Sequence, residues 1–225
     1  MSDEQREEEL TFVKEFAGQA GEAFAASPGI RRILAPNPSP FTYQGTNSYV
    51  VGRGSVAIID PGPDDQTHVD RLLDIVRGET VTHIVVTHTH RDHSPAARAL
   101  SAMTGAPIVG CAPYVPHLDS EGDQIRLDAS HDALHAPQQI MRDGDAISGA
   151  GWTLTALETP GHASNHVCFR LVEENALFSG DHVMGWSTSI VSPARRDSGM
   201  HTGPWHAPSG FNVQPVPSSN SLFGT

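Results

Sequence analysis

The sequence predicts an α/β fold in which two β-sheets pack face to face and helices cover the sandwich, with a metal site at one edge of the two sheets. Two observations predict this fold. Short apolar runs alternate with helical patterns in the first half of the chain, and strand patterns dominate the second half. Histidine and aspartate directly follow several of the apolar runs. A length of 225 residues suits one such domain with a large core.

The first half of the predicted domain begins with three strands. Residues 30–34 and 48–51 are apolar runs on either side of a proline-rich loop, and residues 56–59 form a short buried strand. Apolar residues then recur with helical spacing from residue 65 to residue 77, and Gly78 is expected to end this helix.

The next predicted strand, residues 81–87, leads into the most polar part of the chain. Ser94-Pro95 is expected to start a second helix, because proline fits the first helical position, and Gly105 is expected to end it. Residues 107–109 give a further strand, and residues 147–178 form the strand-rich second half.

Two segments carry weaker patterns. Residues 1–29 form an N-terminal extension, whose acidic and apolar residues are compatible with an amphipathic helix or with a frayed tail. Residues 111–145 are interpreted as an insertion near the mouth of the site, where a loop can contact substrate. Cys111 is expected to be partly exposed, and Cys168 to be a small hydrophobe in a buried strand. The histidines of the insertion are expected to be surface residues: His117, His131 and His135.

The segment from Thr87 to His93 predicts a metal site. His88 and His90 are two residues apart, so an extended backbone directs both side chains to the same side. Asp92 and His93 follow where the chain turns, and they can face a second cation. Imidazole and carboxylate suit Zn²⁺, Mn²⁺ or Fe²⁺. A histidine-rich surface loop is the alternative, but the position between a buried strand and a helix start disfavours it.

Further donors are expected later in the chain, because six consecutive residues cannot enclose two metal ions. His162 follows a Pro-Gly turn behind a strand-like run, and Asp181 stands at the end of a second apolar segment. A carboxylate can bridge two ions about 3.5–4 Å apart through its two oxygens. Each motif alone is an ordinary turn or strand exit, and their order after the histidine-rich segment makes the combination specific.

This combination resembles the metallo-β-lactamase superfamily, whose signature is His-x-His-x-Asp-His followed by a lone histidine and a bridging aspartate. The resemblance covers about residues 30–193 and implies an αββα sandwich. It also implies that His88, His90 and His162 hold one metal ion. Four further segments resemble the β-lactamase-like protein 2 lineage: Asn37–Thr42, Gly45–Tyr49, Ile58–Pro63 and Gly180–Trp186.

The same resemblance implies a second ion held by Asp92, His93 and Asp181, with Asp181 shared between the two. Asp60 matches an aspartate of the family that braces the metal-binding loop. The resemblance also assigns a catalytic role to Asp92, which would orient the attacking water and accept its proton.

The C-terminal part departs from the family pattern. Relatives carry a further histidine, in a Pro-Gly-His turn well beyond the bridging aspartate, that completes the second metal site. Residues 194–225 are rich in Gly, Pro and Ser, show no period, and are interpreted as a tail that is not homologous to the family. His201 and His206 come early for this ligand, and the sequence leaves open whether either replaces it. A weakened second metal site is the expected consequence.

These features predict a metal-dependent hydrolase with one or two zinc ions, for which manganese or iron are alternatives. A bound metal ion lowers the pKa of water to about 7 and polarises the scissile bond, which serves a small ester, thioester, lactam or related substrate. The chain has no Gly-x-Ser-x-Gly motif for covalent catalysis. A mononuclear or inactive metal-binding relative, an endoribonuclease-type phosphodiesterase and an iron-dependent dioxygenase are the alternatives.

Composition disfavours nucleic acid and a membrane as partners and leaves a small-molecule substrate as the expected one. The net charge is −12, and this acidic balance disfavours nucleic acid, which needs clustered basic groups. No run of eighteen apolar residues is present, so no membrane span is expected. The acidic start of the chain is unlike a secretory signal, and the expected location is the cytoplasm.

Overall fold

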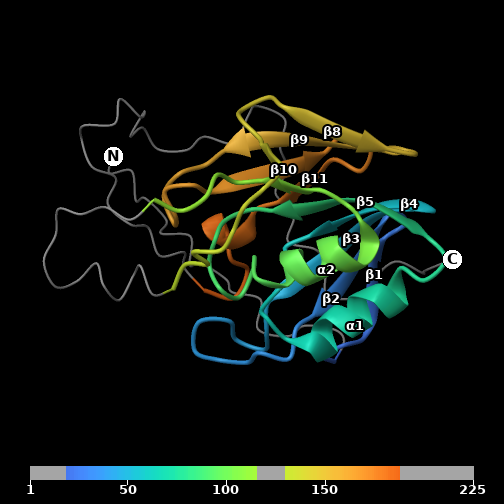
Figure 1. The fold of residues 1–225 in the computed structure, drawn as a ribbon, viewed down its shortest axis with the longest axis horizontal. Helices are drawn as coiled ribbons and strands as arrows, with labels where there is room; N and C mark the ends of the chain where they lie inside the picture. The colour runs from blue at the N-terminus through green and yellow to red at the C-terminus, as the bar shows by residue number, and fades with distance from the viewer. Residues whose placement is uncertain (1–18, 116–129, 188–225) are drawn as a thin grey trace, which may run out of the picture.

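The computed structural model describes residues 19–115 and 130–187, and these ranges contain two β-sheets packed face to face (Figure 1). The larger sheet has seven strands in the order β1-β2-β3-β4-β5-β6-β7, and the smaller has four in the order β11-β10-β9-β8. The strands of the larger sheet are β1 (Ala23–Ser27), β2 (Ile30–Leu34), β3 (Asn47–Arg53), β4 (Ser55–Ile59), β5 (Thr80–Val86), β6 (Ile108–Gly110) and β7 (Gln139–Ile140). Those of the smaller sheet are β8 (Ala146–Gly149), β9 (Trp152–Glu158), β10 (Val167–Leu171) and β11 (Ala176–Phe178). The predicted sandwich of two sheets is confirmed.

The larger sheet changes direction at β4. Strands β1 to β4 pair antiparallel, with short turns at β1–β2 and β3–β4 and the proline-rich loop 35–46 between β2 and β3, whereas β5, β6 and β7 run parallel to β4. Parallel neighbours need a crossover, and helices α1 and α2 supply the first two. The parallel arrangement brings the C-terminal ends of β4, β5 and β6 to one edge of the sheet. Polar residues that follow these strands therefore lie close together.

The two predicted helices are present, and α2 ends at the predicted Gly105, whereas α1 ends at Ile75, before the expected stop at Gly78. Helix α1 spans Gln66–Ile75, and the Asp65 carboxylate caps it by accepting a hydrogen bond from the His68 amide at 2.9 Å. Helix α2 spans Ala96–Thr104 and ends at Gly105, which has a φ of 76°. Both helices lie on the face of the larger sheet that is turned away from the smaller one (Figure 1). Within the described ranges, no α-helix covers the outer face of the smaller sheet.

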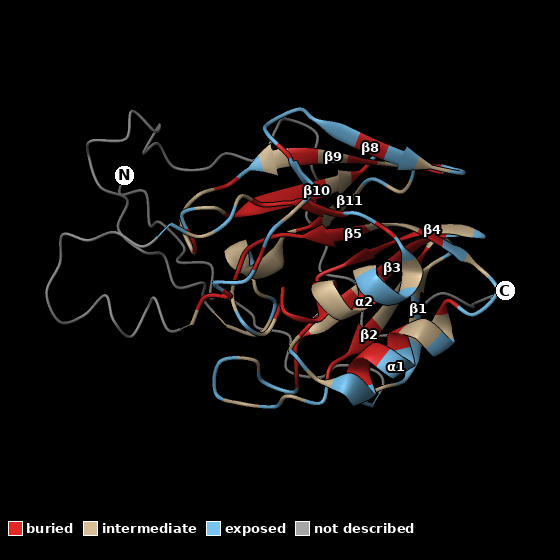
Figure 2. Ribbon diagram, in the orientation of Figure 1, coloured by how far each residue is buried: buried red, intermediate tan, exposed pale blue. Residues whose placement is uncertain are grey.

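The core fills the space between the sheets and the space under the helices, as the buried segments in Figure 2 show. The Trp152 indole from the smaller sheet donates a hydrogen bond to the Ser55 carbonyl of the larger one at 2.8 Å, which fixes the far ends of the two sheets together. Both cysteines are fully buried, so the prediction of partial exposure for Cys111 is wrong. Most of the largest fully buried side chains are apolar, among them Ile33, Ile58, Ile59, Leu72, Ile84, Leu100, Leu154 and Phe169, and two are histidines, His68 and His88.

The end of the predicted N-terminal extension is a strand rather than a helix. Residues Ala23–Ser27 pair antiparallel with β2, and Arg32 lies over the Phe24 ring at 5.3 Å. Gly21, with a φ of 81°, turns the chain before this strand, a conformation that a helix does not contain. Sheet pairing therefore outweighs the helical spacing for these residues, and residues 1–18 lie outside the described ranges.

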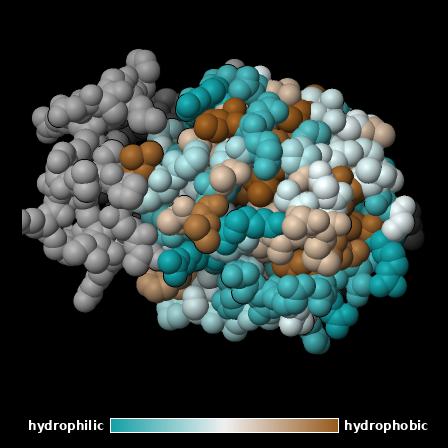
Figure 3. Space-filling model, in the orientation of Figure 1, coloured by the Kyte–Doolittle hydropathy of each residue, from teal (hydrophilic) through white to brown (hydrophobic). Residues whose placement is uncertain are grey.

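On the face drawn in Figure 3, hydrophilic side chains separate small hydrophobic areas. No helix of the described part is long and apolar enough to cross a membrane.

Candidate metal centre

Four strand ends meet at one edge of the sandwich and carry the candidate metal centre. Asp60 follows β4, the loop Thr87–Ser94 (the metal loop) follows β5, His162 follows β9 and Asp181 follows β11. The two sheets join here, because the Val167 amide of β10 donates a hydrogen bond to the Thr87 carbonyl at 2.8 Å. Residues that are distant in sequence thus lie close together at the ends of these strands.

Asp60 holds the beginning of the metal loop from beneath. The backbone of Asp60 has a φ of 46°. Its carboxylate accepts hydrogen bonds from the Thr87 amide and the Thr87 hydroxyl, both at 2.8 Å. The same carboxylate accepts from His93 Nδ1 at 3.0 Å. The Thr87 hydroxyl donates to Asp60, so it accepts from His88 Nδ1, which lies 3.0 Å away. These contacts leave Nε2 of His88 and of His93 available as donors to a metal ion.

The first donor group consists of His88, His90, His162 and Asp181. One donor atom from each residue lies within 4.8 Å of all the others. His90 Nδ1 is 3.0 Å from His88 Nε2 and 3.0 Å from His162 Nε2, so three imidazole nitrogens converge on one point. Three imidazoles and one carboxylate are a donor set that fits a tetrahedral zinc ion.

The second donor group consists of Asp92, His93 and Asp181. His93 Nε2 lies 3.2 Å from Asp92 Oδ2 and 3.3 Å from Asp181 Oδ1. Thr46 reaches the group from the loop before β3, and its hydroxyl donates to Asp92 Oδ2 at 3.0 Å. Asp181 directs its other oxygen, Oδ2, toward His162 and His88, so its carboxylate lies between the two groups.

The surroundings of the imidazoles shift their pKa values in opposite directions in the two donor groups. Desolvation, followed by the neighbouring histidines, holds the pKa of His88 well below its ordinary value and lowers that of His90 to about 3. Both rings are therefore neutral, as metal ligands must be. Burial also acts to lower the pKa of His93, but the surrounding carboxylates outweigh it, led by Asp92 and then Asp181, and raise this pKa well above the usual range. The second group therefore favours positive charge, which a divalent cation also supplies.

Gly180 and His166 form a support under Asp181 that the sequence did not indicate. A Cβ atom on Gly180 would lie 2.6 Å from His166 Nε2 and 2.7 Å from the Thr87 hydroxyl, and the residue has a φ of 48°. Only glycine fits this close approach without strain. His166 is buried, lies with its ring centroid 5.0 Å from that of His88, and its Nδ1 is 2.9 Å from the Thr159 hydroxyl. In the sequence, only the position of His166 shortly after His162 could have pointed to this support.

The histidines predicted to lie on the surface are buried where the structure describes them. His131 stacks on Tyr114 with the ring centroids 3.6 Å apart, and its Nδ1 is 2.8 Å from the Thr89 hydroxyl. His135 packs against Cys111, with Nε2 at 3.4 Å from the sulfur and 3.1 Å from the carbonyl oxygen. These contacts span 42 and 24 residues of sequence, and local polarity does not reveal them. His117, His201 and His206 lie outside the described residues.

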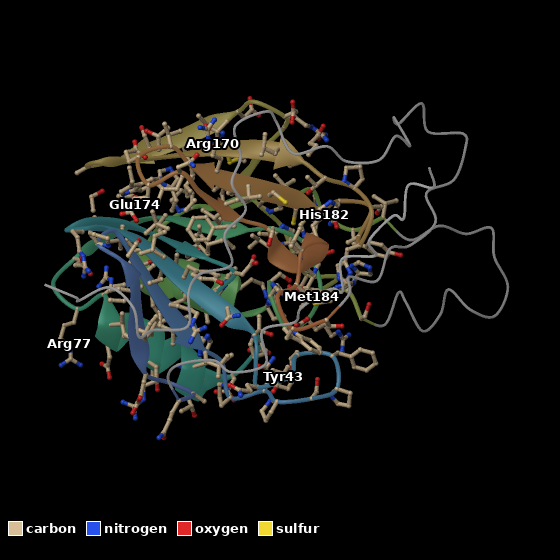
Figure 4. The ribbon with its side chains drawn as sticks, turned by 180° about the vertical axis from the view of Figure 1, so that it is seen from behind. Tyr43, Arg77, Arg170, Glu174, His182 and Met184 are labelled. Carbon is tan, nitrogen blue, oxygen red and sulfur yellow. The ribbon has the colours of Figure 1, made fainter. Side chains whose placement is uncertain are left out.

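An aromatic pair and a cavity lie close to the centre. Tyr43 and Trp186 stack with their ring centroids 5.2 Å apart, and they belong to the segments that carry Thr46 and Asp181. In Figure 4, Tyr43, Met184 and His182 lie at the same end of the molecule, whereas Arg77 lies at the opposite end. A cavity of about 190 Å³ opens beside the His162 turn, lined by Pro113, Val115, Met141, Pro160, Asn165 and His166 among others.

Comparison with known proteins agrees with this geometry. The sequence model of the Metallo-beta-lactamase superfamily matches residues 42–220. The chain belongs to the metallo-β-lactamase superfamily. The matched residues include all six histidines and aspartates of the two donor groups. They also extend across the tail for which the sequence predicts no homology, a segment outside the described residues, so that boundary stays a prediction.

Curated relatives are lactamase-like and thioesterase proteins of fungi. A lactamase-like protein of Pestalotiopsis microspora is 35% identical over 168 residues, which are 73% of this chain and 47% of the relative. An atrochrysone carboxyl ACP thioesterase of Aspergillus terreus is 35% identical over the same length, with the same coverage of both chains. The chain thus spans about half the length of the curated relatives it matches.

Solved structures share the fold. A metallo-beta-lactamase family protein of Thermus thermophilus is 25% identical with a TM-score of 0.57, over 74% of this chain and 64% of that one. A beta-lactamase domain protein of Burkholderia ambifaria is 20% identical with a TM-score of 0.59, over 80% of this chain and 62% of that one. The fold predicted from the sequence motifs is therefore confirmed.

Proposed function

We propose that the protein is a zinc-dependent hydrolase that acts on a small thioester or related acyl compound. The observation that carries the proposal is the convergence of two donor groups on one shared carboxylate, Asp181. In this proposal His88, His90 and His162 hold the first ion and Asp92 and His93 the second, with Asp181 contributing to both. A bound metal ion supplies a water of lowered pKa and polarises the scissile carbonyl.

Asp92 is the residue that would orient the attacking water. Its side chain is 28% exposed, more than that of His93 at 6% or Asp181 at 22%. The Thr46 hydroxyl and His93 fix one carboxylate oxygen, Oδ2, so the other can accept a hydrogen bond from water. Burial acts to raise the pKa of Asp92, but His93 and the Thr46 hydrogen bond outweigh it and lower the pKa. Asp92 is thus ionised at neutral pH and able to accept a hydrogen bond from the water that it would orient.

The thioester class rests on the relatives and on the surroundings of the centre. Several relatives are named as atrochrysone carboxyl ACP thioesterases. The cavity beside the His162 turn has apolar walls of Val115, Met141 and Pro160, which suit an uncharged acyl or carrier chain. The acidic net charge of −12 disfavours the phosphodiesterase alternative, because a nucleic acid backbone would be repelled. The finer placement in the β-lactamase-like protein 2 lineage is part of this proposal.

The test combines metal analysis with three classes of substrate. Protein purified without an affinity tag is analysed for bound metal and is then incubated with an aryl thioester, a chromogenic lactam and an aryl phosphodiester. We expect zinc-dependent turnover of the thioester that a chelator removes and added zinc restores. Bound zinc without turnover of any substrate would contradict the hydrolase and support a binding-only relative. Turnover of the phosphodiester alone would contradict the substrate class.

A further inference from the structure

A short segment, Ser130–His135, lies against the metal loop and contacts residues of it that Asp60 does not. Residues 90 and 131 form an isolated antiparallel bridge. The Arg91 amide donates a hydrogen bond to the Ser130 carbonyl at 2.9 Å, and the Asp132 amide donates to the Thr89 carbonyl at 2.6 Å. The backbone on both sides of His90 is therefore paired with this segment.

Asp132 extends the contact to the start of helix α2. Its side chain is 6% exposed, and one oxygen, Oδ2, accepts hydrogen bonds from the Ser94 hydroxyl at 3.1 Å and from Arg98 NH1 at 2.5 Å. The other oxygen accepts from the Leu134 amide at 3.0 Å. Ser94 is the last residue of the metal loop and Arg98 lies in the first turn of α2. Asp132 thus connects the middle of the metal loop to its end.

A buried carboxylate is stable only where donors replace the water it has lost. Asp132 has three donors, one of them a guanidinium, and charge-assisted bonds of this kind are short and directional. If the carboxylate were neutralised, Arg98 would lose its partner and the segment would lose its attachment to α2. The expected result is a metal loop in which residues 89–94 are no longer fixed by this segment.

We propose that Asp132 is a positioning residue. By attaching the segment Ser130–His135 to Ser94 and Arg98, it fixes the metal loop and thereby sets the affinity of the centre for its metal ion. Asp60 fixes the imidazole of His93 directly and that of His88 through the Thr87 hydroxyl, whereas Asp132 fixes the segment whose backbone pairs on both sides of His90. The proposal rests on the metal centre of the proposed function, but it requires no hydrolytic activity. Partners behind metal ligands of this kind change metal affinity by about 10–100-fold when they are removed.

The test compares Asp132→Asn with a matched control, Glu79→Gln. Glu79 accepts hydrogen bonds from Arg31 at 2.6 Å and from the Gly54 amide at 2.7 Å, and it stands before the opposite end of β5. Both variants remove the charge of a largely buried carboxylate paired with arginine. Zinc affinity is measured by competition with a chromophoric chelator, at a temperature where circular dichroism shows both variants folded. We expect a loss of about 10–100-fold for Asp132→Asn and less than about twofold for Glu79→Gln.

Hydrogen exchange of the metal-free protein gives a second readout. We expect faster exchange of amides in residues 87–94 for Asp132→Asn and no change there for Glu79→Gln. Wild-type zinc affinity in Asp132→Asn, or equal losses in the two variants, would overturn the proposal. If Asp132→Asn does not fold, Arg98→Gln replaces it, because this side chain is 36% exposed, and about a threefold loss or more is expected. A wild-type protein that binds no zinc would instead contradict the proposed function.

Discussion

The two donor groups share Asp181 but differ in how completely they are built. The first has four donors drawn from three separate segments, and His88 within it is fully buried. The second has three donors, of which Asp92 and His93 are adjacent in sequence and Asp92 is the more exposed. The first group would supply all four ligands of a four-coordinate ion, whereas the second would leave a coordination position for water or substrate. The difference indicates a tightly held ion beside a weaker one.

Removal of the shared carboxylate should have the largest effect, because both groups depend on it. We expect Asp181→Ala to lower metal content from about two equivalents to one or fewer, and to lower turnover at least about 100-fold. Elemental analysis and initial rates measure these losses. Asp70→Ala, an exposed carboxylate on α1, is the matched control and should change neither. Two equivalents of metal in Asp181→Ala would show that the groups do not share this residue.

Variants confined to one group should separate the two ions. We expect His90→Ala to remove the tighter binding step in a zinc titration, and Asp92→Asn to weaken only the second step, by about 10–100-fold. The physical reason is that His90 belongs to the first donor group alone and Asp92 to the second alone. Equal effects of the two variants on both steps would contradict the difference between the groups.

A buried histidine outside the centre provides a metal-independent pH effect. Burial lowers the pKa of His68 to about 4, and its Nε2 lies 2.9 Å from the Ser48 hydroxyl. The unfolded chain binds this proton near pH 6.5, so stability falls as the pH decreases from about 6.5 to 4. We expect about 2 kcal/mol less unfolding free energy at pH 5 than at pH 7 from this residue.

Urea unfolding with and without zinc measures this dependence. His68→Gln has no titrating group and should show a smaller decrease between the two pH values. If the decrease were the same in the variant, the pH effect would belong to the donor groups instead.

The smallest effect is expected under the shared carboxylate. Gly180→Ala places a methyl group against His166 and requires a positive φ from alanine, at a cost of about 1–2 kcal/mol. Because Asp181 follows directly, both zinc steps should weaken together. Gly151→Ala, with a φ of 78° and open space around its Cβ, is the control for backbone strain alone. A loss of stability without any change in zinc binding would exclude a role for Gly180 in placing Asp181.

The sequence predicted the parts of the molecule that are encoded locally. Strand and helix limits followed apolar periods and the stop at Gly105, and the cluster from His88 to His93 is contiguous. The later histidine and aspartate, His162 and Asp181, were found through their turn context and through family resemblance. The structure brings these residues together as expected.

What the sequence did not reveal depends on contacts between distant segments. Asp132 binds Ser94 and Arg98, more than thirty residues away, and Thr46 reaches Asp92 across 46 residues. Neither contact has a local pattern. The same reason explains why His131 and His135 were expected on the surface: a polar, proline-rich stretch indicates exposure unless its partners are known. The structure supplies those partners.

The position of Asp181 has a consequence for how the chain unfolds. His88 comes from the metal loop after β5, whereas Asp181 comes from the short turn Gly180–His182 after β11, and their side chains approach to 4.0 Å. A metal ion held by both would act as a reversible crosslink that closes a loop of about ninety residues, and long loops gain the most from such closure. Opening of the smaller sheet would then require release of the ion first. Zinc would therefore slow unfolding and proteolysis of the second half of the chain, in addition to any part it takes in chemistry.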